Sequence, residues 1–310
     1  SIEISDFTNS PEILDGRVKT LHPKLYGGIL FKRNNKKHQK QIKKINIKKI
    51  DLVIVNFYPF EEAVKTGNEK KIIENIDIGG PTLVRAAAKN YEDVTVITDT
   101  SQYIALQNEM NKYRGSTSLN FRKILSRDAF LETGYYDTKI TEYLNKSNND
   151  SPPPKRKLIG GNLVENLRYG ENPHQSASVY SLNKEINIKQ LNGKKLSYNN
   201  YNDIFTGISL SKSFTKDYST VIIKHANPCG VALDKRKIDS YLKAYECDPT
   251  SAFGGIISCN YKVDKTVAKE ILSKFYEVVV ANGFESGALK ILKRKKNCLL
   301  YTSPSPRDDL

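Results

Sequence analysis

The sequence predicts a two-domain α/β protein, and three observations carry that prediction. Short apolar runs at 50–57, 94–98, 221–223 and 277–281 alternate with helix-like segments, which is typical of a strand layer flanked by helices. The length of 310 residues suits about two domains. A polar, proline-rich stretch at 148–157 reads as the linker between them.

Composition sets the broad class. Apolar residues make up 38% and charged residues 27% of the chain, as in ordinary soluble proteins. No run approaches the roughly 18 apolar residues of a membrane span, and the start at Ser1 has no signal-peptide pattern. Because the chain begins without Met, we expect the native N-terminus to lie upstream. The four cysteines lack CxxC spacing, which favours reduced thiols in the cytoplasm.

The formal charge of +15 invites a nucleic-acid hypothesis. The lysines, however, are scattered through polar stretches rich in Asn and Ile, such as 32–49. That pattern fits a solvated surface better than a reading face. We therefore expect anionic small-molecule substrates and no nucleic-acid partner.

The first segment, 1–31, carries three cations: Arg17, Lys19 and Lys24. Thr20 and His22 lie between the last two of them. Its glycines and Pro23 predict a loop-rich segment rather than a long helix. Guanidinium, ammonium and hydroxyl donors on one loop suit a phosphate or another anion. An ordinary basic surface loop is the alternative.

The run 50–57 predicts a fully buried parallel strand. Asn56 and Tyr58 come at its carboxyl end, the edge where open α/β sheets bind ligands. A helix at 69–75 then leads to Asp77, Ile78 and a Gly-Gly-Pro-Thr turn that begins with Gly79 and opens a helix at 83–90. A glycine-rich turn before a helix is a ready anion site. Lys89 lies late in that helix.

Further elements follow in the same alternation. A buried strand is predicted at 94–98, and helices are predicted at about 100–112, 118–145, 203–214, 237–247, 264–275 and 285–293, with strands at 256–259 and 277–281. Arg168 and Tyr169 belong to a compact polar turn, where Arg168 suits a phosphate and Tyr169 suits a base or orders the loop. Asn192-Gly193 indicates a hairpin or tight turn.

The stretch 221–230 organises the second half. β-Branched residues form a short strand that delivers Lys224 and His225 before Pro228 and Gly230 break it. Adjacent strand residues point to opposite faces, so the two can share a pocket only if the strand ends or bulges there. A histidine beside a cation suits general-base work. The alternative is a structural histidine and a solvated lysine.

Seven motifs in family order closely resemble the bifunctional purine-biosynthesis enzymes AICAR transformylase/IMP cyclohydrolase. They are GRVKTLHPKLYGGIL, NFYPF, NIDIGGPTLVRAAAKN, LRYGENPHQ, KKLSYNNYND, KHANPCG and DPTSAFGG, and they cover nearly the whole chain. The resemblance implies a methylglyoxal-synthase-like parallel-sheet domain at 1–147. It also implies a cytidine-deaminase-like α/β transformylase subdomain, of which 158–297 is the first part.

The resemblance implies two reactions. A formyl group passes from 10-formyltetrahydrofolate to AICAR, and formyl-AICAR then closes to IMP with loss of water. It further implies a cytoplasmic homodimer that needs no metal. Proton transfer and positioning suffice for the cyclisation, and a cation helps at the oxyanion of formyl transfer.

Site residues are implied in the same way. The cyclohydrolase nucleotide would contact Arg17, Lys19, Thr20, Asn56, Asp77, Ile78 and Gly79. Lys89 would be its acid–base residue, with Lys19, Tyr58 and Asp77 stabilising the closing ring. In the transformylase, AICAR would contact Arg168, Tyr169, Gly254 and Glu277, with His225 taking the amine proton and Lys224 stabilising the formyl oxygen.

The family extends further at both ends, so we expect a fragment with an incomplete phosphate cradle and an incomplete folate site. The resemblance ends near Asn297, and 298–310 is predicted to be a non-native, disordered tail without function. Two other classes stay open. One is a non-catalytic purine-nucleotide-binding module, and the other is a basic nucleic-acid-binding protein, which a steep salt dependence would reveal.

Overall fold

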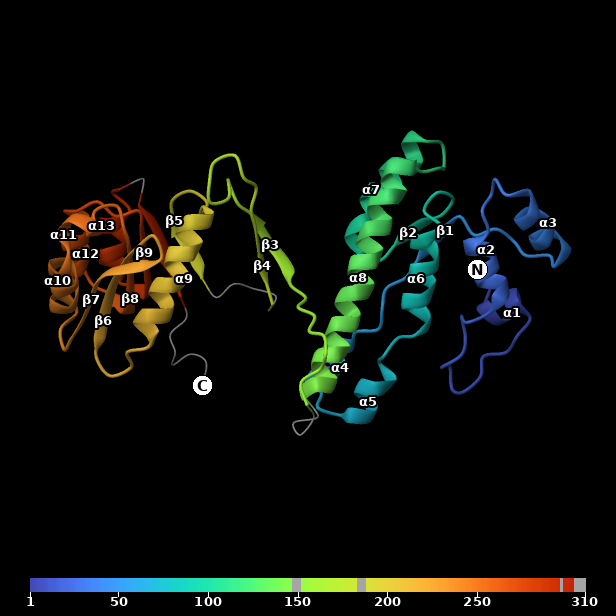
Figure 1. Cartoon of the computed structure of the whole chain (residues 1–310), viewed down its shortest axis with the longest axis horizontal. Helices are drawn as coiled ribbons and strands as arrows, with labels where there is room; N and C mark the ends of the chain where they lie inside the picture. The colour runs from blue at the N-terminus through green and yellow to red at the C-terminus, as the bar shows by residue number, and fades with distance from the viewer. Residues whose placement is uncertain (147–151, 183–187, 296–297, 304–310) are drawn as a thin grey trace. The chain divides into compact units, whose positions relative to one another are not determined.

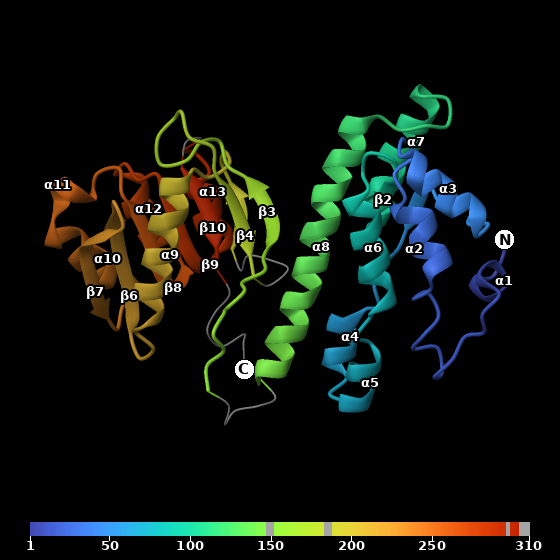
Figure 2. The ribbon, with the colours of Figure 1, turned by 45° about the vertical axis from the view of Figure 1, so that its right-hand side comes forward.

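The computed structural model describes residues 1–146, 152–182, 188–295 and 298–303. The chain divides between Gly160 and Gly161 into two units, which are described separately. Figures 1 and 2 show the helices and strands of each unit from two directions.

The first unit is mostly helical around one short parallel strand pair. Its elements are α1 (Ile4–Thr8), α2 (Pro23–Leu30), α3 (Lys36–Lys44), β1 (Leu52–Ile54), α4 (Phe60–Lys65), α5 (Glu69–Glu74), α6 (Gly79–Lys89), β2 (Thr95–Ile97), the 3₁₀ turn η1 (Thr100–Gln102), α7 (Tyr103–Lys112) and α8 (Leu119–Lys146). The long helix α8 runs beside α6 and β2 (Figure 1). The main core packs α2, α6, α7 and α8 around both strands, as Ile29, Val84, Leu106 and Leu125 illustrate.

The strands β1 and β2 pair in parallel, with Val53 opposite Val96. The prediction of a fully buried strand over 50–57 is wrong for β1. Val53 is 7% exposed, whereas Leu52 is 36% and Ile54 47% exposed. Alternate residues of a strand face opposite sides, so the described chain covers only one face of β1.

The prediction that 1–31 holds no long helix is confirmed, because α1 has five residues and α2 has eight. Pro23 suits the first helical position of α2. Gly28 lets α2 approach the segment before β1 closely, since a Cβ on Gly28 would lie 2.5 Å from the carbonyl oxygen of Lys48. The helix predicted at 83–90 begins earlier, at Gly79.

The second unit contains a six-stranded mixed sheet. Its elements are β3 (Asn162–Asn166), β4 (Ser178–Ser181), β5 (Lys189–Asn192), α9 (Tyr198–Lys212), β6 (Tyr218–Lys224), β7 (Asn227–Asp234), α10 (Lys237–Cys247), α11 (Pro249–Ala252), β8 (Ile256–Val263), α12 (Lys265–Leu272), β9 (Val278–Phe284), α13 (Ser286–Leu292) and β10 (Leu299–Thr302). The strand order is β5-β10-β9-β8-β6-β7, with β8, β9 and β10 parallel. The strands β3 and β4 form a separate antiparallel pair.

Residue alternation divides this sheet into two buried faces. Ile257, Val279 and Leu300 point to the face covered by α10, α12 and α13. Ile256 and Val278 point to the opposite face, which α9 covers. The helices thus sandwich the sheet (Figure 2), which explains why its strands read as continuous apolar runs.

The prediction of a disordered tail over 298–310 is wrong for its first part. Residues 299–302 form β10, which lies between β5 and β9. Leu299, Leu300 and Tyr301 are 3%, 0% and 5% exposed. Leu300 packs in the core on one face of the sheet, and Leu299 and Tyr301 pack in the core on the other. Burial of these apolar side chains therefore stabilises the strand. Residues 304–310 lie outside the described part of the chain.

Within the described ranges, no helix is long and apolar enough to cross a membrane. The same residues bring together no group of three or more His, Cys, Asp or Glu side chains that could hold a metal ion.

Candidate functional site

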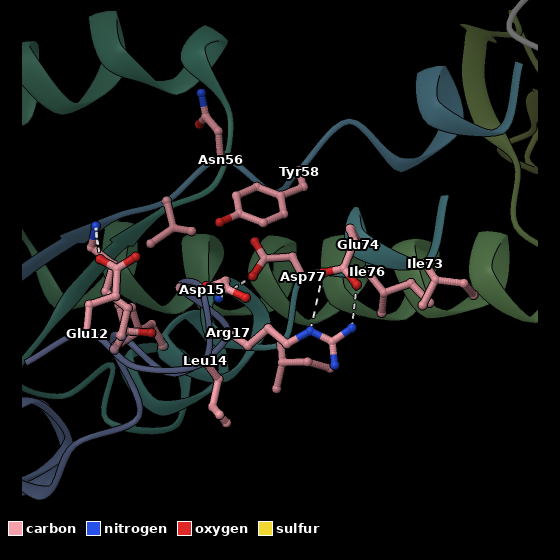
Figure 3. A pocket seen from close by; sticks show the side chains of 18 of the residues that line it. Glu12, Leu14, Asp15, Arg17, Asn56, Tyr58, Ile73, Glu74, Ile76 and Asp77 are labelled. Carbon is pink, nitrogen blue, oxygen red and sulfur yellow. Dashed lines mark hydrogen bonds and ion pairs between the residues drawn. The ribbon is translucent and has the colours of Figure 1, made fainter. Parts of the chain in front are cut away.

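A cavity of about 1080 Å³ opens in the first unit (Figure 3). Three segments supply its walls: the loop before α2, the chain that leaves β1, and the turn between α5 and α6. Residues predicted for the cyclohydrolase nucleotide or ring closure line it together: Arg17, Lys19, Thr20, Asn56, Tyr58, Asp77, Ile78 and Gly79. The cavity is large enough for a nucleotide-sized ligand.

The fold places the cavity at the carboxyl end of β1. The backbone N–H of Val55 donates to Ile97 and extends the pairing with β2, after which the chain turns away and presents Asn56 and Tyr58. The N-terminal loop, which a bridge between Ile13 and Val18 closes on itself, lines the same cavity with Arg17, Lys19 and Thr20. Segments far apart in sequence therefore meet at this edge of the strand pair, as open α/β sheets lead one to expect.

Both basic side chains of the cavity are paired with carboxylates. Arg17 donates from Nε to Glu74 at 3.3 Å and also from its second terminal nitrogen, as Figure 3 shows. Lys19 Nζ lies 2.9 Å from Glu12. These hydrogen bonds raise the pKa of Arg17 and of Lys19 and lower the pKa of Glu74. An anionic ligand that bound Arg17 would compete with Glu74, and one that bound Lys19 would compete with Glu12.

The two glycines that open α6 leave space for polar side chains. A Cβ on Gly79 would lie 2.4 Å from Thr20 Oγ1, and one on Gly80 would lie 2.3 Å from Asp77 Oδ2. Asp77 Oδ1 accepts a hydrogen bond of 2.8 Å from the Gly80 N–H. The glycine pair is therefore explained by close approach of Thr20 and Asp77, and Asp77 caps the first turn of α6.

Lys89 does not line this cavity. It is exposed in the last turn of α6, while Gly79 begins the helix at the cavity. Ten helical residues span about 15 Å, which exceeds the reach of a lysine side chain. In the described unit, Lys19 is the lysine that lines the cavity.

In the second unit, residues predicted for the transformylase gather at one end of the large sheet. Ile223, Ile256 and Val278 are neighbours across β6, β8 and β9. Lys224, the last residue of β6, therefore lies at the same end of the sheet as Gly254 and Glu277, which come just before β8 and β9. Hydrogen bonds tie this edge together. Lys224 Nζ donates to the Phe253 carbonyl at 2.9 Å, and the Glu277 N–H donates to Gly255 at 3.0 Å.

The strand β6 ends at Lys224, as the joint use of Lys224 and His225 requires. His225 and Ala226 form a two-residue turn into β7, and a bulge lies between Ile222 and Ile223. The predicted role of Pro228 and Gly230 as strand breakers is wrong, because both belong to β7. Proline is tolerated there because β7 is an edge strand.

Arg168 and Tyr169 lie in the loop between β3 and β4, and the Arg168 guanidinium carbon is 5.3 Å from the Tyr169 ring centroid. This loop contacts α9, because Asn199 Nδ2 donates to the Glu171 carbonyl at 3.3 Å. On the same helix, Asn200 Nδ2 donates to Glu277 Oε2 at 3.0 Å. Helix α9 thus connects the Arg168 loop with the sheet edge.

Sequence reasoning missed four residues that shape these places: Glu12, Glu74, Tyr136 and Asp203. Glu12 and Glu74 belong to none of the seven motifs and give no pattern of their own. Tyr136 lies in α8, far along the chain from the cavity. Asp203 ends the quoted motif KKLSYNNYND, which was the one available signal.

Comparison with known proteins agrees with this arrangement. Residues 1–82 match the MGS-like domain, and residues 87–309 match the AICARFT/IMPCHase bienzyme family. The second match continues past Asn297, where the resemblance was expected to end.

Full-length relatives match almost the whole chain. A bifunctional purine biosynthesis protein PurH from Acetivibrio thermocellus is 48% identical over 309 residues, which covers 96% of this chain and 59% of the relative. The PurH protein of Ruminiclostridium cellulolyticum is 45% identical and covers 100% of this chain and 61% of the relative. For Roseobacter denitrificans PurH the values are 42%, 99% and 59%.

The chain therefore spans about three fifths of the length of the curated relatives it matches. The family match alone covers well over half of the chain. It includes the strand β10 and the hairpin that carries Lys224 and His225. This chain belongs to the AICARFT/IMPCHase bienzyme family and carries an MGS-like domain at its N-terminal end.

Proposed function

We propose that the first unit closes formyl-AICAR to IMP and that the second unit binds AICAR for formyl transfer from 10-formyltetrahydrofolate. The observation that carries the proposal is the cavity of the first unit, where Arg17, Lys19, Asn56, Tyr58 and Asp77 converge from separate segments. Membership of the family supports it.

Cyclisation joins the carboxamide nitrogen of formyl-AICAR to its formyl carbon. The carboxamide nitrogen and the formamide nitrogen each lose one proton, and the formyl oxygen takes up both and leaves as water. Arg17 suits the phosphate, because a guanidinium binds phosphate oxygens in pairs. Lys19, Tyr58 and Asp77 are the titratable groups that stand with Asn56 at the carboxyl end of β1.

We assign the proton transfers to Lys19 and Asp77 rather than to Lys89. Lys19 and Asp77 line the cavity, and Asp77 is fixed by its hydrogen bond to Gly80. Lys89, which the resemblance implies as the acid–base residue, lies at the other end of α6. Holding the reacting nitrogen near the formyl carbon supplies much of the acceleration.

For formyl transfer, the amine of AICAR attacks the formyl carbon of the folate, and a tetrahedral oxyanion forms. Its collapse breaks the bond between the formyl carbon and the folate nitrogen, and the proton lost by the amine ends on the nitrogen of the released tetrahydrofolate. His225 would take the amine proton and Lys224 would stabilise the oxyanion. Arg168, Tyr169, Gly254 and Glu277 would hold the nucleotide. Homodimer formation and a cytoplasmic location are part of the same proposal. Sedimentation of the purified chain tests the former.

The test is cyclisation of formyl-AICAR by the purified chain, followed by ultraviolet absorbance. Asp77→Asn and Lys19→Ala should each lower turnover by about 10²-fold or more, as expected for an acid–base group. Lys89→Ala should retain turnover within about threefold, since the loss of an exposed lysine outside the site changes little. Loss of turnover in Lys89→Ala alone would return the acid–base role to that residue.

A further inference from the structure

The turn that presents His225 has an unfavourable backbone conformation. Between Lys224, which ends β6, and Asn227, which begins β7, only His225 and Ala226 remain. Their φ angles are 54° and 57°, so both are left-handed. Two-residue hairpins of this kind favour Asn-Gly or Gly-Gly, because a Cβ makes the left-handed region costly. Something outside the turn must therefore stabilise it.

The side chain of Asp203 in α9 makes that contact. Its Oδ1 accepts a hydrogen bond of 2.6 Å from the Ala226 N–H. Burial raises the pKa of Asp203, and this is opposed by the Ala226 N–H, by the nearby His225 imidazole and by the His225 backbone N–H. The carboxylate thus faces both residues of the turn.

Asp203 lies on a face of α9 that makes further contacts. One helical turn earlier, Asn200 is held by Ser197 in a capping box and donates to Glu277. Residues three apart lie on the same helix face. The same face of α9 therefore contacts the His225 turn and the Glu277 end of β9.

We propose that Asp203 is a positioning residue of the second site, whose carboxylate binds the Ala226 N–H and holds the left-handed turn that presents His225. This inference rests on the proposed role of His225 in formyl transfer. Asp203 acts through the backbone of the turn and need not touch the substrate.

The test compares AICAR binding by calorimetry in the full chain and its variants. Asp203→Ala should weaken binding about tenfold, the size of one charge-assisted hydrogen bond. Asp203→Asn keeps an acceptor oxygen and should lose less. Asp203→Ala combined with Ala226→Gly should regain most of the affinity, because glycine adopts the left-handed conformation without a Cβ clash.

Asp264→Ala is the matched control. Asp264 also accepts backbone hydrogen bonds, from Thr266 and Val267. It follows the last residue of β8, whereas Gly255 precedes the first, so Asp264 lies at the far end of this strand from the proposed site. It should lower the midpoint of thermal unfolding without changing AICAR affinity. A double variant that binds no better than Asp203→Ala would overturn the proposal.

Hydrogen exchange of the Ala226 amide separates this proposal from the proposed function. Exchange should be about tenfold or more faster in Asp203→Ala, since the amide loses its acceptor. If wild type does not bind AICAR while this acceleration occurs, the proposed function fails and the hold of Asp203 on the turn stands. Equal exchange in both proteins overturns the role of Asp203 whatever AICAR does.

Discussion

The phenol oxygen of Tyr136 lies 2.8 Å from the backbone nitrogen of Asp77 and 2.9 Å from the carbonyl oxygen of Asn75. It accepts from the first and donates to the second. Tyr136 is 7% exposed, and its ring packs against Phe57 and Phe60. One side chain of α8 therefore fixes the loop that delivers Asp77 to the cavity.

Tyr136→Phe keeps the ring packing and removes both hydrogen bonds. We expect the free energy of unfolding to fall by about 1–2 kcal/mol, because the Asp77 N–H and the Asn75 carbonyl lose a buried partner. Cyclisation should fall more than stability alone explains, since Asp77 moves. Tyr143→Phe, whose ring also packs on Phe60 from α8, is the control. Equal effects of the two variants on turnover would contradict the positioning role.

Gly79→Ala and Gly80→Ala should damage the cavity in different places. The new Cβ would meet Thr20 Oγ1 in the first and Asp77 Oδ2 in the second. Both should weaken nucleotide binding, measured by calorimetry, although alanine is the better helix former. Gly134→Ala in α8 is the matched control, because its Cβ would meet nothing within 4 Å. It should raise stability by about 0.5–1 kcal/mol and leave binding unchanged.

Glu74→Gln should strengthen binding of a phosphate-bearing ligand by about two- to fivefold, since Arg17 no longer has a competing charge and exposed ion pairs are weak. The hydrogen bond from Arg17 lowers the pKa of Glu74. Wild-type Glu74 therefore stays charged until the pH falls below the ordinary pKa of a glutamate. The advantage of the variant should therefore persist at neutral pH and vanish only when Glu74 is protonated. Glu142→Gln, which breaks a pair with Lys139 in α8, should not change affinity.

The strand β10 should be essential to the second unit. Leu300→Ala removes a fully buried side chain from β10, between β5 and β9, and should cost about 2–5 kcal/mol in unfolding free energy. Lys290→Ala, at an exposed position in α13, should change stability by less than about 0.5 kcal/mol. Denaturant unfolding measures both. Similar midpoints for Leu300→Ala and wild type would restore the idea of a dispensable tail.

Cysteine labelling reports on the same sheet. Burial raises the pKa of Cys259 and of Cys298 to about 11, so few thiolates form at neutral pH. We expect iodoacetamide to label exposed Cys247 first, with Cys259 and Cys298 reacting only after unfolding. Mass spectrometry of digested protein gives the order. Rapid native labelling of Cys298 would mean that the segment before β10 is not packed.

The alternation of apolar runs predicted most helices and half of the described strands: β1, β2, β6, β8 and β9. The strands β6, β8 and β9 could be predicted because they are buried on both faces. The strands β3, β4, β5, β7 and β10 were missed. The alternation overestimated the burial of β1, since a sequence does not reveal how many neighbours a strand has.

The resemblance predicted that Arg17, Asn56 and Asp77 contact one nucleotide, and the fold places all three on one cavity. The contacts of Tyr136 and Asp203 could not be predicted, because each links residues brought together only by folding. The prediction for the end of the chain was wrong because it relied on the resemblance ending near Asn297 and gave no weight to the apolar run Leu299-Leu300-Tyr301.

Helix α9 contacts three otherwise separate pieces of chain through one stretch of its surface: the Arg168 loop through Asn199, the start of β9 through Asn200, and the His225 turn through Asp203. Inserting one residue between Asn200 and Asp203 would rotate Asp203 by about 100° relative to Asn199 and Asn200, given 3.6 residues per turn. Evolution can thus exchange side chains along α9 but cannot change its length here. An alignment of related chains should show substitutions between Ser197 and Ile204 and no gaps.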